Sequence, residues 1–255
     1  VRVLTGETPL DERDDSFADL ALGSVDVLLT TPEFLAIHAE RFASSGRVGF
    51  VVVDEAHHAG AAKGGSRSSY TALPRVLERL GGPVALAVTA TAEEGVAREI
   101  CLLLSINADD GVVVDRSVRE NLHVVDYRGL HDREAALVSV VATGMKTVVY
   151  VNSRERSVSL ARMLRKNVPE LGQRIAFYNA GLTREDLFRV EAAFRDGRLS
   201  CIVSTSAFGE GANLPDIRNV VLYHMPFGSI EFNQMSGRAG RDGDDAWVYL
   251  LFGSR

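Results

Sequence analysis

Two neighbouring carboxylates close an apolar run in VVVDEAHHAG, residues 51–60. Asp54 and Glu55 follow three valines directly, and His57 and His58 come shortly after them. Because burying an unpaired charge costs several kcal/mol, adjacent acidic side chains at a strand end are normally solvated or hold a ligand. One carboxylate of such a pair can hold Mg²⁺, and the other can orient a water molecule for attack on a phosphoryl group. The alternatives are a solvated acidic turn and, less favoured because no HExxH motif is present, a zinc site at the histidines.

Two arginines three residues apart stand in QMSGRAGRDG, residues 234–243. We expect Arg238 and Arg241 to lie on one face of a helix, with Gly237 and Gly240 allowing other atoms to approach closely. An arginine projected onto phosphates can stabilise the charge that develops when a phosphoryl group is transferred. The alternative is a helix end with solvated arginines, but these glycines make a poor free-standing helix.

Short apolar runs alternate with amphipathic segments along most of the chain. Runs that are continuously apolar are typical of strands covered on both faces of a parallel sheet. The expected strands are residues 1–4, 25–31, 48–54, 84–90, 147–152, 174–179, 199–205 and 220–225. The expected helices are residues 32–42, 70–80, 93–104, 154–166, 183–197 and 229–240, with Thr183 as an N-cap and Gly197 as a C-terminal stop.

These strand–helix units predict an α/β fold with two domains built on mainly parallel sheets flanked by helices. The apolar period lapses in DRSVREN, residues 115–121, so we place one domain at residues 1–117 and the other at 118–255. Ligands of open parallel sheets lie at the carboxyl ends of the strands. Polar residues fall at four such ends, namely Asp54-Glu55, Thr89-Ala90-Thr91, Asn152-Ser153 and Ser204-Thr205.

The composition excludes several other classes of protein. Of the 255 residues 46% are hydrophobic, and no apolar run approaches the roughly 20 residues of a membrane helix. The two cysteines, Cys101 and Cys201, form neither a disulfide framework nor a cysteine-rich zinc site. We therefore expect a cytoplasmic protein with no membrane partner. The net charge of −6 predicts no strong nonspecific adhesion to nucleic acid, so any such contact depends on local groups.

Seven segments, in order, make the chain resemble superfamily 2 helicases of the DEAH type, most closely RecQ-like DNA helicases. TTPEFL (30–35) resembles motif Ib, VVVDEAHHAG motif II and LAVTATA (86–92) motif III. YVNSR (150–154) resembles motif IV, and FYNAGL (177–182) the stretch that follows it. STSAFGEGAN (204–213) resembles motif V and QMSGRAGRDG motif VI. The resemblance implies two RecA-like domains, the first truncated at its N-terminal side: residues 1–117 with motifs Ib to III and residues 118–255 with motifs IV to VI.

The same resemblance implies roles for individual residues. Asp54 would hold Mg²⁺ through water, Glu55 would be the catalytic base, and Arg241 would be the arginine finger. His57, helped by Thr89 and Thr91, would relay between the nucleotide and the second domain. The residues implied to line the nucleotide cleft are Asp54, Gly209, Gly211, Asn213, Gln234, Arg238 and Arg241. Those implied to face a nucleic-acid strand are Thr31, Pro32, Glu33, Arg67, Asn152, Ser153, Arg154, Ser204 and Thr205.

Two departures from the family pattern matter. No GxxxxGK[ST] phosphate loop occurs in the chain, so we expect that loop upstream of Val1 and expect these 255 residues alone neither to bind ATP tightly nor to hydrolyse it. RecQ-like proteins also carry an aromatic-rich loop after DEAH that senses single-stranded DNA by stacking. Here Ala62 and Ser66 replace its Trp and Phe, while Arg67 and Tyr70 remain. Stacking is worth about 1–3 kcal/mol per base, so coupling to DNA in the RecQ manner is put in doubt.

The sequence thus predicts an ATP-dependent helicase core that couples hydrolysis to movement on, and unwinding of, DNA, as in DNA repair and recombination. Its implied cofactors are ATP and Mg²⁺. Its implied partners are single-stranded or partly duplex DNA, or RNA, and further domains of one longer polypeptide. The alternatives are a Ski2-like or other RNA-directed helicase, because QMSGRAGR also occurs in that branch, and a catalytically inactive nucleic-acid-binding scaffold.

Overall fold

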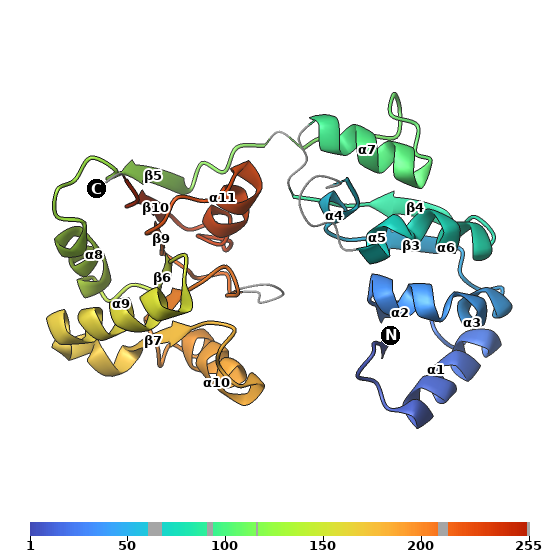
Figure 1. Ribbon diagram of the computed structural model, residues 1–255, viewed down its shortest axis with the longest axis horizontal. Coiled ribbons are helices and arrows are strands. Elements are labelled where there is room, and N and C mark those ends of the chain that lie inside the picture. The colour runs from blue at the N-terminus through green and yellow to red at the C-terminus, as the bar shows by residue number, and fades with distance from the viewer. Residues whose placement is uncertain (61–67, 91–93, 116, 209–213, 254–255) are drawn as a thin grey trace. The chain divides into compact units, whose positions relative to one another are not determined.

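The computed structural model describes residues 1–60, 68–90, 94–115, 117–208 and 214–253. Its internal contacts divide the chain into two compact units, Val1–Asp115 and Arg116–Arg255. This division lies two residues from the boundary that the sequence suggests. The two units are coloured blue to green and green to red in Figure 1, and each has its own hydrophobic core.

Unit 1 contains two pairs of parallel strands packed on helices. The strands are β1 (Arg2–Leu4) with β2 (Leu28–Thr30), and β3 (Phe50–Val53) with β4 (Val84–Ala87). The helices are α1 (Leu10–Leu22), α2 (Pro32–Ile37), α3 (Ala39–Ser44), α4 (His57–Gly60), α5 (Ser68–Thr71), α6 (Leu73–Arg79) and α7 (Glu94–Leu104). Parallel pairing brings the ends of β3 and β4 to the same edge, where Asp54 and Thr89 follow them.

Only one face of these strand pairs is covered by the described part of unit 1. Leu4 and Val53 lie in the core with α-helical residues such as Phe34. The alternating side chains point away from that core and are exposed: Val3 (56%), Leu29 (55%), Phe50 (57%), Val52 (55%), Val84 (66%) and Leu86 (47%). The sequence predicted strands covered on both faces, because the runs are continuously apolar. The second face therefore presents an apolar surface that the described residues leave open.

Two predicted helices of unit 1 are each divided in the structure. The segment 32–42 breaks at His38, where α2 ends and α3 begins. The segment 70–80 divides into α5 and α6, and Pro74 stands in the first turn of α6. Proline has no amide hydrogen and clashes with the preceding turn, so it is accommodated where a helix starts rather than inside one. Helix α1 has no counterpart among the predicted elements.

Unit 2 is a six-stranded parallel sheet with the strand order β5-β10-β9-β6-β8-β7. The strands are β5 (Leu122–Asp126), β6 (Thr147–Tyr150), β7 (Ile175–Tyr178), β8 (Cys201–Ser204), β9 (Asn219–Leu222) and β10 (Ala246–Leu250). Strands β6 to β9 match predicted runs, whereas β5 and β10 at one side of the sheet were not predicted. The predicted α/β class with mainly parallel sheets is confirmed.

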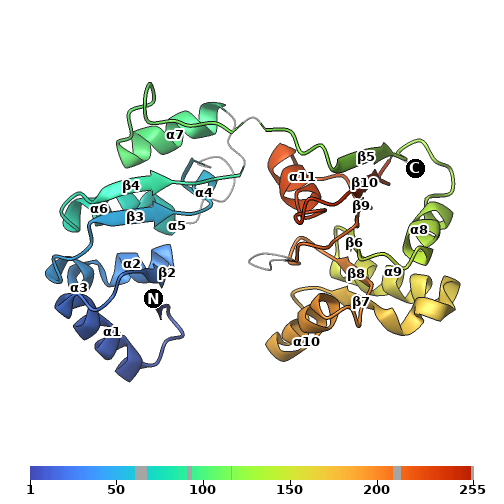
Figure 2. The ribbon, with the colours of Figure 1, turned by 180° about the vertical axis from the view of Figure 1, so that it is seen from behind.

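Helices cover both faces of the unit 2 sheet, as Figure 2 shows from behind. Helices α8 (Arg133–Ala142) and α9 (Arg154–Asn167) pack on the face that carries Val149 and Val203. Helices α10 (Arg184–Arg195) and α11 (Ser229–Ser236) pack on the opposite face, with Val148 and Ile202. A short 3₁₀ helix, η1 (Pro169–Arg174), precedes β7. The strand side chains alternate between two buried faces, which explains why these strands read as unbroken apolar runs.

The helix ends of unit 2 test three sequence signals. Thr183 caps α10 as predicted, because its Oγ1 accepts the Asp186 amide at 3.2 Å. Gly197, with φ of +74°, lies just beyond the end of α10, also as predicted. Helix α11 is shorter than predicted and ends at Ser236, so Arg238 and Arg241 do not share a helical face. The backbone of Gly240 has φ of +55°, which a right-handed helix cannot accommodate.

None of the helices in the described ranges is long and apolar enough to cross a membrane.

Candidate functional site

The predicted carboxylate pair lies in a tight turn after β3. Glu55 has φ of +48°, a left-handed conformation that is unusual for a residue other than glycine. The Asp54 side chain stabilises the turn, because its Oδ1 accepts the Glu55 amide at 2.8 Å. The Ala56 amide donates to the Val88 carbonyl at 3.0 Å, which ties the turn to the segment after β4. Strained backbone of this kind persists only where the surroundings hold it, and it is common at functional sites.

Glu55 and Thr89 meet at the buried ring of His57. The His57 Nδ1 atom lies 3.0 Å from Thr89 Oγ1 and 3.2 Å from Glu55 Oε2. Burial and the nearby His58 lower the pKa of His57, against the opposing charges of Glu55 and Asp54. The lowered pKa favours the neutral ring, whose Nδ1 is within hydrogen-bond distance of Thr89 Oγ1. His57 and Thr89 are thus in contact within unit 1, and the relay role that the family resemblance implies for them stays a prediction.

Protein groups satisfy the Glu55 carboxylate only in part. Its Oε2 is buried but, despite the short distance to His57, has no hydrogen bond of good geometry to any described residue. A buried acceptor without a donor costs about 1–3 kcal/mol. The Glu55 side chain is 46% exposed, so the accessible part of the same carboxylate is open to a water molecule. Asp54 is exposed beside it. One accessible carboxylate with a second one nearby suits Mg²⁺, which keeps most of its waters and binds phosphate oxygens, so the residues present fit that ion.

A second set of contacts joins the carboxylate turn to the segment that contains Glu33. The Tyr70 hydroxyl donates to the Asp54 carbonyl at 3.3 Å, and the adjacent Ser69 donates to Glu33 Oε1 at 2.6 Å. Thr31 caps α2 by accepting the Phe34 amide at 3.2 Å. Thr31 and Pro32 are partly exposed and Glu33 is exposed, so the three residues are accessible at the surface of unit 1. Their contact with a nucleic-acid strand stays a prediction.

The predicted arginines of unit 2 lie in consecutive turns that follow α11. Gln234, in the last turn of α11, and Arg238 are partly exposed, and Arg241 is exposed. The Arg241 Nε donates to the Gly237 carbonyl at 3.2 Å. Partial desolvation and then the charges of Arg238 and Arg119 lower the pKa of the Arg241 guanidinium. The three positive charges lie close enough together to affect one another, and such a cluster favours an incoming anion such as phosphate.

Buried Tyr150, the last residue of β6, lies beneath these arginines. Burial raises the pKa of its phenol to about 12, and the positive charges of Arg238 and Arg241 oppose that shift. Its hydroxyl is 3.4 Å from the Phe208 carbonyl. The sequence placed Tyr150 in a strand but assigned it no part in the site. An aromatic residue within an apolar run carries no signal of the charged groups that fold against it.

Gly240 fixes the shape of the arginine turn. A Cβ atom at this position would lie 2.7 Å from the Asp244 carbonyl oxygen and 2.8 Å from Asn121 Nδ2. We expect Gly240→Ala to reduce the free energy of unfolding by at least about 2 kcal/mol, because the substitution adds a backbone clash to an unfavourable positive φ. Urea or thermal unfolding of purified protein measures this change.

Gly197→Ala is the matched control for that substitution. Gly197 also has a positive φ, of +74°, but a Cβ atom there would meet nothing within 4 Å. It therefore reports the conformational cost without the clash, about 1–2 kcal/mol. Equal losses for the two variants would show that the arginine turn yields to the extra atom.

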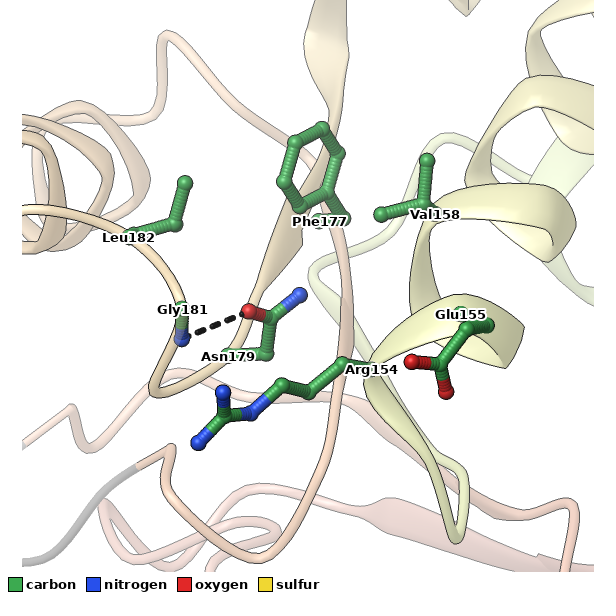
Figure 3. A pocket seen from close by; sticks show the side chains of 7 residues that line it. All are labelled: Arg154, Glu155, Val158, Phe177, Asn179, Gly181 and Leu182. Atoms are coloured by element: carbon green, nitrogen blue, oxygen red, sulfur yellow. Dashed lines mark hydrogen bonds between the residues drawn. The ribbon is translucent and has the colours of Figure 1, made fainter.

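The strand ends of unit 2 place a further group of predicted residues around the start of α9. Asn152 is exposed, and Ser153 caps α9 by accepting the Arg156 amide at 3.1 Å. Arg154 is exposed at an open groove of about 440 Å³ (Figure 3). The groove is lined by Arg154, Glu155, Val158, Phe177, Asn179, Gly181 and Leu182. Buried Asn179 donates to Ser157 Oγ and accepts the Gly181 amide, both at 2.9 Å, which fixes the FYNAGL loop beside Arg154.

The other residues predicted to contact nucleotide or nucleic acid are either at the end of β8 or outside the described part of the chain. Ser204 is completely buried, and its hydroxyl donates to the Tyr178 carbonyl at 3.0 Å or the Thr205 carbonyl at 2.7 Å. It therefore stabilises the end of β8, while partly exposed Thr205 is accessible. The predicted roles of both toward nucleic acid are not tested by these contacts. Five further predicted residues lie outside the described part of the chain: Arg67, Thr91, Gly209, Gly211 and Asn213.

Comparison with known proteins agrees with the fold and the motifs. The DEAD/DEAH box helicase model matches residues 1–99, and the helicase conserved C-terminal domain model matches residues 132–243. Human ATP-dependent DNA helicase Q4 is 30% identical over 257 residues, which cover 94% of this chain and 21% of that protein. Probable ATP-dependent DNA helicase RecS of Bacillus subtilis is 32% identical over 211 residues, which cover 80% of this chain and 41% of that protein.

A solved structure supports the fold independently. Helicase Lhr of Mycobacterium smegmatis, bound to single-stranded DNA and AMP-PNP, superposes with a TM-score of 0.72 at 22% identity. That match covers 97% of this chain and 34% of Lhr. The chain belongs to the DEAD/DEAH-box helicases of superfamily 2 and, by its relatives, to their RecQ-like members. It spans less than half the length of each of these relatives.

Proposed function

We propose that this chain is the greater part of an ATP-driven DNA helicase motor. The observation that carries the proposal is the Glu55 carboxylate, which a turn with φ of +48° holds 3.2 Å from His57 Nδ1 with 46% of its side chain exposed. A carboxylate held in this way suits the orientation of a water molecule for attack on a γ-phosphoryl group. The two family models, which together match residues in both units, support the same assignment.

The two units contribute different groups to this reaction. Asp54 would hold Mg²⁺, which would supply positive charge to the phosphate oxygens. Glu55 orients the attacking water and accepts its proton. Arg241 and Arg238 stabilise the negative charge that grows on the transferred phosphoryl group, and Gln234 contacts the nucleotide beside them.

The strand is bound through its phosphates, which positions it without reading its sequence. In unit 1 the accessible residues Thr31, Pro32 and Glu33 support this role. In unit 2 it is supported by Asn152, Arg154 and Thr205. DNA is favoured over RNA because the relatives Q4 and RecS are named as DNA helicases.

The motor also needs chain beyond these residues. The exposed side chains on β1 to β4 form an apolar face that a folded protein normally covers. We propose that a further segment of a longer polypeptide, which includes the phosphate-binding loop, packs on this face. Hydrolysis by the present 255 residues alone is therefore not expected.

The test uses the full-length protein from which this chain comes. Phosphate release from ATP is measured with and without single-stranded DNA, and unwinding is measured on DNA and RNA duplexes of matched sequence. We expect DNA-stimulated turnover with Mg²⁺ and faster unwinding of the DNA duplex. Preference for the RNA duplex would favour the RNA-directed alternative, and nucleic-acid binding without turnover would favour the inactive scaffold.

A further inference from the structure

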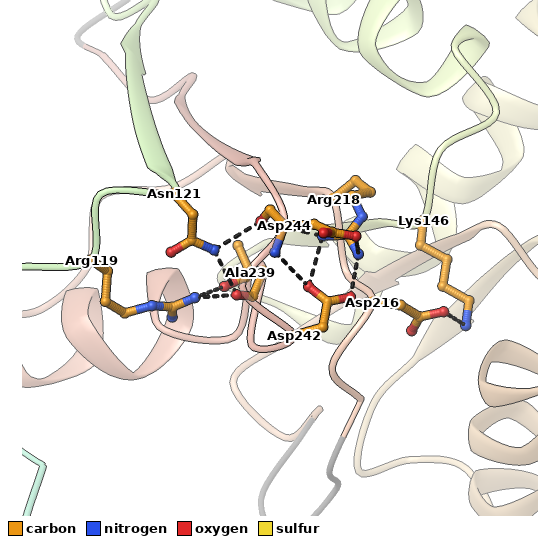
Figure 4. Close-up of polar contacts among 9 residues, drawn as sticks. Arg119, Asn121, Lys146, Asp216, Arg218, Ala239, Asp242 and Asp244 are labelled. Carbon is orange, nitrogen blue, oxygen red and sulfur yellow. Dashed lines mark hydrogen bonds and ion pairs between the residues drawn. The ribbon is translucent and has the colours of Figure 1, made fainter.

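The arginine turn, residues 237–243, is held from one side by the segment that leads into β5. Arg119 donates to three carbonyls of the turn: those of Gly237 at 3.1 Å, Ala239 at 2.7 Å and Gly240 at 2.5 Å. Asn121 adds hydrogen bonds from Nδ2 to the carbonyls of Gly240 and Asp244, both at 2.8 Å. Figure 4 shows these two side chains reaching the turn from the segment just before β5. They lie in the stretch that the sequence marked only as a domain boundary.

The other side of the turn is held through its carboxylates. Arg218 pairs with Asp242 and lies 3.3 Å from Asp244 (Figure 4). Near it, Lys146 pairs with Asp216 at 2.6 Å. Arg218 thus anchors acidic side chains, whereas Arg119 and Asn121 anchor the backbone. The two anchors constrain different parts of the same turn.

The backbone anchor is needed because α11 has ended before the turn begins. Within a helix, carbonyls are occupied by amides four residues onward. Here the backbone bonds are few and irregular, as in the bonds from Ala239 to Ser236 at 3.1 Å and from Gly240 to Ile217 at 2.8 Å. The Gly240 carbonyl still accepts a backbone amide, that of Gly243 at 3.1 Å. The carbonyls of Gly237 and Ala239 depend on side chains for donors, and one planar guanidinium can serve several carbonyls at once.

Arg119 and Arg241 share one acceptor. The Gly237 carbonyl accepts Arg119 Nη1 at 3.1 Å and Arg241 Nε at 3.2 Å. Arg119 therefore fixes the oxygen on which the Arg241 guanidinium is oriented. The positive charge of Arg119 also lowers the pKa of Arg241. It adds to the positive potential that attracts an anion to the turn.

We propose that Arg119, assisted by Asn121, is a positioning residue that orients Arg241 toward the transferred phosphoryl group. The proposal rests on the proposed ATP hydrolysis, and it assigns the boundary segment a part in that reaction. Arg119 itself touches carbonyl oxygens of the protein and acts through Arg241. Displacing a catalytic group by about 1 Å can cost up to about 100-fold in rate.

The experiment is a double-mutant cycle on ATP hydrolysis by the full-length protein with saturating single-stranded DNA. Arg119→Ala is expected to lower kcat by about 10- to 100-fold with KM for ATP little changed, because Arg241 acts on charge that develops in the transition state. In an Arg241→Ala background, Arg119→Ala is expected to cause no further loss, because its partner is already absent. Arg119→Lys, which keeps the charge but not the planar donor set, is expected to fall between Arg119→Ala and wild type.

Arg128→Ala is the matched control, because Arg128 pairs with exposed Asp126 elsewhere in unit 2. It is expected to leave kcat unchanged. Additive losses in the cycle, or a rise in KM with kcat unchanged, would overturn the proposal. If Arg119→Ala fails to fold, as judged by thermal unfolding, Asn121→Ala in the same cycle decides, since it removes only two of the five bonds. Inactivity of the wild-type protein would instead refute the proposed function.

Discussion

Replacing Glu55 by Gln is expected to lower ATP turnover by the full-length protein about 10²- to 10⁴-fold. Glutamine has nearly the same shape, so the turn with φ of +48° and its bond to Asp54 are preserved. What is lost is the negative charge at Oε2, which lies buried and without a good hydrogen bond beside His57. Phosphate release in the presence of single-stranded DNA measures the effect.

Stability and strand binding separate this prediction from damage to the fold. An amide is less costly to bury than an unpaired carboxylate, so the midpoint of thermal unfolding should not fall. Binding of a labelled DNA strand should stay near that of the wild type. Glu99→Gln, on the exposed surface of α7, is the matched control and should leave turnover unchanged. Parallel loss of turnover and strand binding by Glu55→Gln would contradict the role assigned to Glu55.

Replacing Arg241 by Ala is expected to lower kcat about 10³-fold or more, the range observed for arginine fingers in phosphoryl transfer. Arg241 is exposed after α11, and the positive charges of Arg238 and Arg119 beside it favour the binding of an anion. Removing one positive charge relieves repulsion within the turn, so the free energy of unfolding should hold steady or rise slightly. Steady-state kinetics with varied ATP measures kcat and KM separately.

The control for Arg241 is Arg198→Ala, because Arg198 is exposed and pairs with Asp196 outside the arginine turn. It should leave both kinetic constants unchanged. An Arg241→Ala protein that keeps full kcat but needs far more ATP would show that the guanidinium binds the ground state and the transition state equally. In that case Arg241 would be a nucleotide-binding residue rather than a finger.

Local patterns in the sequence were sufficient for most of unit 2. The runs at β6, β8 and β9 are apolar on both alternating faces, so burial under two layers of helices followed from them directly. The Thr183 cap and the Gly197 stop also depend only on nearby residues, and both were predicted. Strand β5 was missed because the polar residues His123 and Asp126 interrupt its apolar run. Strand β10 has no such interruption, since AWVYL is continuously apolar, and it was overlooked.

For the candidate site, too, some features could be predicted from the sequence and others only from the folded structure. Asp54, Glu55 and Arg241 could be selected from the sequence, since charged residues beside apolar runs and glycines are visible locally. The end of α11 at Ser236, the burial of Ser204 and the contacts of Arg119 could not. Each depends on which residues the fold brings together across long separations, such as the 118 positions between Arg119 and Gly237.

The sequence by itself thus determined most of the element types, the motif order and the choice of candidate residues for chemistry on phosphate, because periodicity and side-chain chemistry are local properties. The tertiary structure alone decided how those residues are held. Donors and acceptors pair according to distance in space, so the anchoring of the arginine turn by Arg119, and the approach of Glu55 Oε2 to His57, became apparent only in the folded chain.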